Sequence, residues 1–112
     1  MKITDIASLP VGDNPHHVDA RLAYDTEHAS VVVLTFKPGE ELKKHITPVD
    51  VFFYVLEGTG VVEIGDEEAV VKKDQLVESP LGIPHRWFNR SDALLRVLVV
   101  KVPKPTKGTR IL

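Results

Sequence analysis

Short apolar runs separated by turn-forming residues dominate the middle of this 112-residue chain. Each run is rich in β-branched side chains and is too short to form a helix with its own apolar stripe. The expected strands lie at residues 31–36, 51–56, 61–64, 69–71 and 93–102. Turn signals such as Pro38-Gly39 and Gly65-Asp66 stand between them. About eight strands at this spacing predict an all-β antiparallel sandwich or small barrel.

The composition is that of an ordinary folded domain, with 43% hydrophobic and 27% charged residues. The length predicts one domain over residues 1–112. We expect about 15 N-terminal residues to form an irregular lead-in or edge strand and residues 103–112 to form a loose tail. Because the chain has no cysteine, histidine and carboxylate side chains are the only strong metal ligands it offers.

The charge and hydropathy patterns exclude two classes of partner. The formal net charge is −2, which gives no basic surface for a phosphate backbone. No apolar stretch approaches the length of a membrane span. We therefore expect a cytoplasmic protein that binds neither nucleic acid nor membrane.

Two of the expected strands are apolar on both faces, which bears on assembly. Residues 31–34 and 51–56 show none of the polar alternation of a sheet with one solvated face. An exposed face of this kind is larger than soluble monomers usually show. The pattern therefore predicts a homodimer.

The first of two motifs lies around the second expected strand. Gly39, His45 and Gly58 stand at the spacings of the first cupin motif, which this segment resembles. Thr47 occupies the place of the motif's second histidine, and Val51 that of its glutamate. Glycines at and after position 58 are expected to adopt positive φ in the hairpin that follows the strand.

The second motif precedes the last expected strand. Pro80, Gly82, His85 and Asn89 match the second cupin motif at each of its positions except its leading glycine, which is replaced by Lys73. Two spaced motifs in the right order make the resemblance specific. It implies a small single-domain cupin, whose fold is an antiparallel jelly-roll barrel, also called a double-stranded β-helix.

The pocket of such a barrel would gather side chains from both motifs. Side chains alternate along a strand, so His45 and Thr47 face the same way, as do His85 and Trp87. The prolines before His85 stiffen its loop and make it the best candidate for a general acid or base. Residues expected to line the pocket beside the two histidines are Thr47, Val51, Tyr54 and Trp87.

The resemblance also implies a divalent metal held by three histidines and one glutamate. Of these ligands the chain keeps only His45 and His85. Asp50, one residue from the position of the missing glutamate, is the candidate third ligand, with His16 and His17 as further candidates. We expect zinc, nickel, manganese or iron to be held weakly or not at all.

Three functions agree with these residues. The first is the binding of a small organic molecule in the pocket. The second is a cupin enzyme of the dioxygenase, isomerase or decarboxylase type, either metal-dependent or with His85 as acid or base. The third is a non-catalytic homo-oligomeric scaffold or sensor. The fold alone does not separate them, because one fold hosts many functions.

Overall fold

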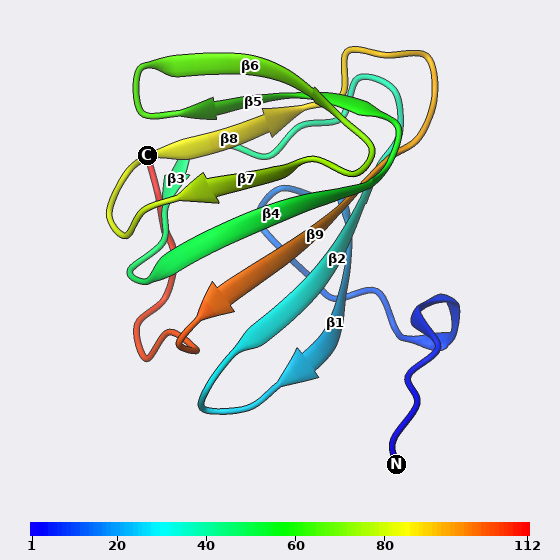
Figure 1. Cartoon of the computed structure of the whole chain (residues 1–112), viewed down its shortest axis with the longest axis vertical. Coiled ribbons are helices and arrows are strands. Elements are labelled where there is room, and N and C mark those ends of the chain that lie inside the picture. The colour runs from blue at the N-terminus through cyan, green and yellow to red at the C-terminus, as the bar shows by residue number, and fades with distance from the viewer.

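The computed structural model describes residues 1–112, and its regular secondary structure is almost entirely β-strand (Figure 1). A single 3-10 turn, η1, spans Ile6–Ser8. No helix is long and apolar enough to cross a membrane. The strands are β1 (Asp19–Asp25), β2 (Ser30–Phe36), β3 (His45–Ile46), β4 (Asp50–Glu57), β5 (Thr59–Ile64), β6 (Glu67–Lys72), β7 (Leu76–Ser79), β8 (His85–Phe88), β9 (Leu95–Val102) and β10 (Arg110–Ile111).

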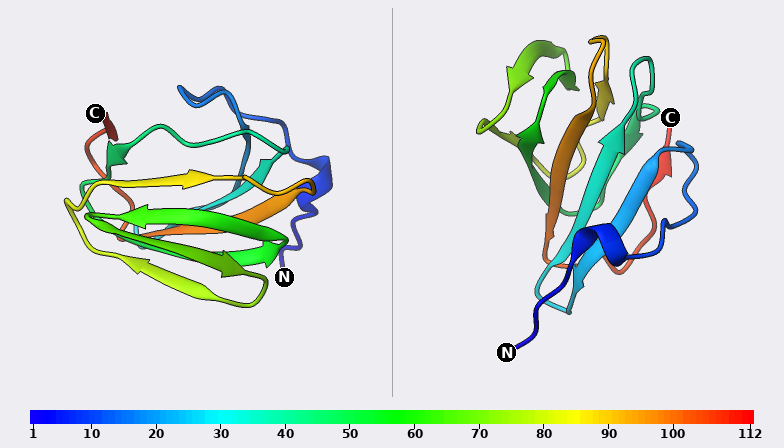
Figure 2. Two further views of the ribbon diagram at one scale, coloured as in Figure 1. Left: turned by 90° about the horizontal axis from the view of Figure 1, so that it is seen from above. Right: turned by 90° about the vertical axis from the view of Figure 1, so that its right-hand side faces the viewer.

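These strands form two five-stranded sheets. The first has the order β1-β2-β9-β4-β7 and the second the order β10-β3-β8-β5-β6, and every pairing is antiparallel. Figure 2 shows the two layers from two further directions. The predicted all-β, antiparallel jelly-roll architecture is confirmed.

The hydrophobic core lies between the two sheets. Alternate residues of β4 and β9 point inward and are almost fully buried, as period-two alternation requires. Trp87 enters from β8 of the opposite sheet and is 0% exposed. The inward residues of the two central strands are Val51, Phe53, Val55, Leu95, Val97 and Val99.

The five strands expected from the sequence correspond to β2, β4, β5, β6 and β9. The other strands carry more charge or are shorter than the runs that signalled a strand. β1 reads Asp-Ala-Arg-Leu-Ala-Tyr-Asp and lies at the edge of its sheet, where water solvates its polar side chains.

The two glycines after β4 act for different reasons. Gly58 has φ +83°, and a Cβ atom there would lie 2.2 Å from the carbonyl oxygen of Leu94. Gly60 has no positive φ, contrary to expectation. A Cβ atom at Gly60 would instead lie 2.6 Å from Cδ2 of Leu95. Glycine is needed at this position because a core side chain packs directly against its backbone.

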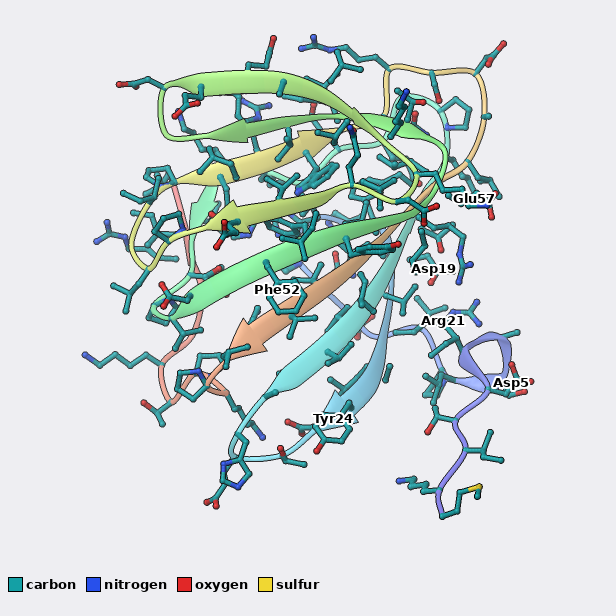
Figure 3. All side chains as sticks on the ribbon, in the orientation of Figure 1. Asp5, Asp19, Arg21, Tyr24, Phe52 and Glu57 are labelled. Atoms are coloured by element: carbon teal, nitrogen blue, oxygen red, sulfur yellow. The ribbon has the colours of Figure 1, made fainter.

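Both ends of the chain are attached to the sheets. Arg21 of β1 donates hydrogen bonds to the carbonyl oxygens of Ile6 and Ala7, which holds η1 beside the first sheet (Figure 3). Residues 103–112, expected as a loose tail, return to the second sheet, where β10 pairs with β3. The β3 edge offers unpaired backbone groups, and β10 satisfies them. This return places C-terminal residues beside His45.

Candidate functional site

His45 and His85 meet between the sheets, as the two motifs predict. They are cross-strand partners on β3 and β8, and both are buried. Their Nε2 atoms lie 2.9 Å apart, and their rings are nearly perpendicular at 78°. Antiparallel pairing thus brings together two side chains that are far apart in the sequence.

With both imidazoles neutral, the hydrogen bonds of this pair form a chain with a single direction. Nδ1 of His45 lies 2.6 Å from the carbonyl oxygen of Lys43, which only accepts, so His45 carries its proton on Nδ1. Nε2 of His45 then accepts from Nε2–H of His85. Nδ1 of His85 in turn accepts from the Ser79 hydroxyl at 2.7 Å. The chain thereby holds each neutral imidazole in a defined tautomer.

The electrostatics of the site favour these neutral forms. The pKa of His85 is lowered to about 3, chiefly because burial disfavours the imidazolium, with added repulsion from His45 and Lys101. Burial also lowers the pKa of His45, although its bond to Lys43 opposes that shift. The pKa of Lys101 is lowered by burial as well.

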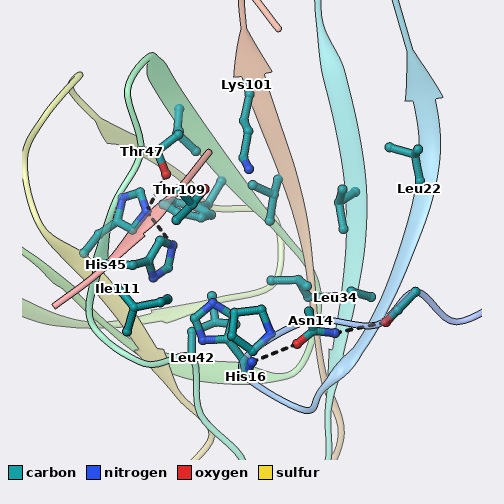
Figure 4. Close-up of a pocket in the computed structure, with 18 of the residues that line it drawn as sticks. Asn14, His16, Leu22, Leu34, Leu42, His45, Thr47, Lys101, Thr109 and Ile111 are labelled. Carbon is teal, nitrogen blue, oxygen red and sulfur yellow. Dashed lines mark hydrogen bonds between the residues drawn. The ribbon is translucent and has the colours of Figure 1, made fainter. Parts of the chain in front are cut away.

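A cavity of about 490 Å³ opens beside the histidine pair (Figure 4). One wall is apolar and comes from β1 and β2 of the first sheet, with Leu22, Val32 and Leu34. The loop from Gly12 to His16 and the C-terminal β10 also contribute to its lining. The cavity therefore combines a large apolar surface with a few polar groups, which is typical of small-molecule sites.

His16 is a cavity residue that lies outside both motifs. Its Nδ1 accepts a hydrogen bond from the backbone N–H of Lys43 at 2.8 Å, and its ring centroid lies 4.9 Å from that of His45. Burial first, and then His45, lower its pKa to about 4. Its neighbour His17 is exposed and does not line the cavity.

The remaining residues predicted for the pocket separate into two groups. Thr47 and Val51 line the cavity, and Oγ1 of Thr47 lies 3.3 Å from Nε2 of His85. Tyr54 does not, because β4 alternation directs it to the outer face, where its hydroxyl donates to Asp74. Trp87 is buried in the core and also lies outside the cavity lining.

Two further polar residues flank Val51, and the sequence interpretation missed both. Val51 is the cross-strand partner of Ser79 on β7 and of Lys101 on β9. Opposite residues share a face of the sheet, so all three form a row that points inward. The sequence does carry a signal for Lys101. Leu95, Val97 and Val99 face the core, so period-two alternation places the next residue of the same parity, Lys101, on the core face as well.

The residues present do not fit the metal site that the motifs imply. Two Nε2 atoms 2.9 Å apart suit neighbouring positions around one ion. However, no group of three histidine, aspartate, glutamate or cysteine side chains converges anywhere in the structure. Asp50 is exposed and accepts from the backbone N–H of Leu81 instead. The position of the missing glutamate holds Val51, which offers no lone pair and lies beside a cationic side chain.

The family comparison agrees with the fold and with the motif frame. The cupin domain model matches residues 32–101, more than half of the chain. The chain belongs to the cupin family.

The matches to curated relatives cover only part of this chain and part of each relative. Polyketide synthase CurC of Streptomyces cyaneus is 33% identical over an alignment of 76 residues that covers 64% of this chain and 49% of that protein. Tetracenomycin polyketide synthase protein TcmJ of Streptomyces glaucescens is 32% identical over an alignment of 75 residues that covers 63% of this chain and 50% of that protein. The matches thus span about half the length of these relatives.

Solved structures match over nearly the whole chain. TT1209 from Thermus thermophilus is 31% identical with a TM-score of 0.81, covering 94% of this chain and 100% of that one. The polyketide cyclase RemF from Streptomyces resistomycificus is 19% identical with a TM-score of 0.85, covering 100% and 85%. At that identity the second match supports the fold alone.

Proposed function

We propose that this cupin binds a small organic molecule in the cavity beside His45 and His85. The observation that carries this proposal is the cavity itself, about 490 Å³ with an apolar wall and converging polar groups. That volume lies within the range of about 300–1,000 Å³ typical of small-molecule sites. The apolar wall would bury the body of the ligand, and the hydroxyl and imidazole groups would orient its polar atoms.

The names of the relatives support an organic ligand of moderate size. Two curated relatives are named polyketide synthase proteins. Polyketides are carbon skeletons that carry carbonyl and enol oxygens. A ligand of that chemical kind would match a cavity with one apolar wall and one polar end.

In this proposal a divalent metal is held weakly or not at all. His45 and His85 are the residues that would hold it, and binding requires the proton on Nε2 of His85 to move to Nδ1. Ser79 would then accept that proton's hydrogen bond instead of donating one, as a hydroxyl can do. With two imidazoles and no carboxylate, the pair would bind zinc, nickel, manganese or iron only when metal is added.

A fragment-binding experiment tests the proposed function. We would titrate 15N-labelled protein with neutral aromatic fragments and follow backbone amide shifts. Binding is expected to shift the amide signals of residues that line the cavity. It should be weaker in Leu22→Trp, because the indole would enter the cavity. Leu76→Trp is the matched control, since both leucines are about half exposed on strands and only Leu22 lines the cavity. Fragments that bind both variants and the wild type equally would contradict the proposal.

We also propose that two copies pair through the outer face of the first sheet. One row of cross-strand neighbours on that face is apolar: Val31 pairs with Val100, which pairs with Phe52. Phe52 lies on the face of β4 opposite the core (Figure 3). Sedimentation at micromolar concentration is expected to give twice the chain mass, and Phe52→Glu is expected to give the monomer. A monomeric wild type would overturn this pairing.

A further inference from the structure

Lys101 is the last inward-facing residue of β9. The three inward positions before it, Leu95, Val97 and Val99, belong to the hydrophobic core. Alternation therefore directs the lysine toward the space between the sheets. Figure 4 shows its side chain pointing into the cavity, which it lines. A lysine at such a position is unusual, because lysine is almost never buried without a partner.

The Lys101 ammonium has no partner within the protein. It makes no hydrogen bond and no ion pair, whereas Lys104, three residues later, pairs with Asp25 at 2.9 Å. Asp13 is the only carboxylate that lines the cavity, and it is exposed and outside ion-pair distance of Lys101. A half-buried cation without a counter-ion costs free energy, so packing alone gives no reason for a lysine here.

The surroundings make this cation the charged pole of the cavity. The histidines that line the cavity, His16, His45 and His85, have lowered pKa values and are neutral near pH 7. Val51, directly across the strand from Lys101, carries no charge. An anionic atom near Lys101 would therefore meet a positive charge in partly desolvated surroundings, where electrostatic attraction is stronger than in bulk water.

We propose that the cavity selects an organic anion, whose carboxylate or enolate oxygen pairs with the Lys101 ammonium while its apolar body packs on Leu22, Val32 and Leu34. This inference rests on the proposed function and adds the chemical class of the ligand. The Lys101 ammonium thus supplies a positive charge in a cavity that lacks the glutamate needed to hold a metal there. The Thr47 hydroxyl, on the same cavity wall as His85, is a further donor for the ligand's oxygen.

A pair of probes that differ in charge tests the inference. The probes are 2-naphthoate and 2-naphthamide, which have the same ring system and nearly the same shape. Their dissociation constants would be measured by calorimetry at pH 7 and low salt for the wild type, Lys101→Met and Lys104→Met. Lys104→Met is the matched control, because it removes a nearby positive charge that does not line the cavity.

The wild type is expected to bind naphthoate at least about tenfold more tightly than naphthamide, as charge-assisted hydrogen bonds imply. Lys101→Met should lose this preference, keep its affinity for naphthamide and melt no lower than the wild type. Lys104→Met should behave like the wild type. Equal binding of both probes by all three proteins would overturn the anion inference and leave the cavity proposal standing. Binding of neither probe would overturn both.

Discussion

Replacing Val51 by glutamate restores the position of the missing metal ligand, but the structure predicts that Lys101 opposes the effect. The two residues are cross-strand partners on the inward face, so the new carboxylate would lie next to the ammonium. At a separation of about 4 Å and an effective dielectric constant of about 20, their attraction is about 4 kcal/mol. Desolvation of both charges offsets part of that energy. Zinc therefore has to compete with the lysine for the carboxylate.

The double variant Val51→Glu/Lys101→Met removes that competition. We expect Val51→Glu alone to raise zinc affinity modestly and the double variant to raise it by a further factor of about 10 to 1,000, since 1.4 kcal/mol corresponds to tenfold. The assay is competition with a chromophoric chelator at pH 7.5 on protein without a histidine tag. Lys101→Met alone is the control and should bind no more tightly than two histidines allow.

Two results would refute this reasoning. If the single and double variants bind zinc equally, Lys101 does not face position 51 as the register indicates. If neither variant binds zinc more tightly than the wild type, the inward face of β4 is not aligned with the histidine pair. Both outcomes are read directly from the dissociation constants.

Three further predictions concern stability, each measured by urea unfolding. Ser79→Ala should lower the free energy of unfolding by about 1–3 kcal/mol because it leaves buried Nδ1 of His85 unpaired, whereas Thr47→Val removes only the longer 3.3 Å contact and should cost less than about 1 kcal/mol; equal losses would contradict the hydrogen-bond chain. The pKa of His85 is lowered from 6.5 to about 3 on folding, so the unfolded chain binds more protons between these values, and stability should be full above pH 6.5 and fall as the pH drops toward 3; a flat profile would argue against burial of neutral imidazoles. Gly58→Ala should cost more than about 2 kcal/mol, because its Cβ meets a backbone oxygen, while Gly39→Ala should cost less, since nothing lies within 4 Å of its Cβ; the reverse order would refute this local geometry.

The fold and the histidine pair could be predicted because they depend on local signals. The apolar runs that became β2, β4 and β9 reflect strand propensity, and the turn residues between them mark their ends. The convergence of His45 and His85 follows from the two motif spacings. Antiparallel pairing then places them opposite one another.

The rest of the site depends on contacts between distant segments, which a single sequence does not reveal. His16 reaches the cavity because its loop is hydrogen-bonded to Lys43, 27 residues away. Residues 103–112 looked like a loose tail because prolines and cations interrupt any strand pattern there, yet β10 completes a sheet edge. Tyr54 was assigned to the pocket although it has the opposite parity from Val51 on β4.

The most direct test of the account is the protonation of the two imidazoles. A long-range 1H–15N spectrum of histidine-labelled protein at pH 7, without added metal, reports which ring nitrogen carries a proton. Burial lowers both pKa values and predicts neutral rings, and the hydrogen-bond chain then places the proton on Nδ1 of His45 and on Nε2 of His85. An imidazolium signal from either residue, or protons on Nδ1 of both rings, would contradict the account.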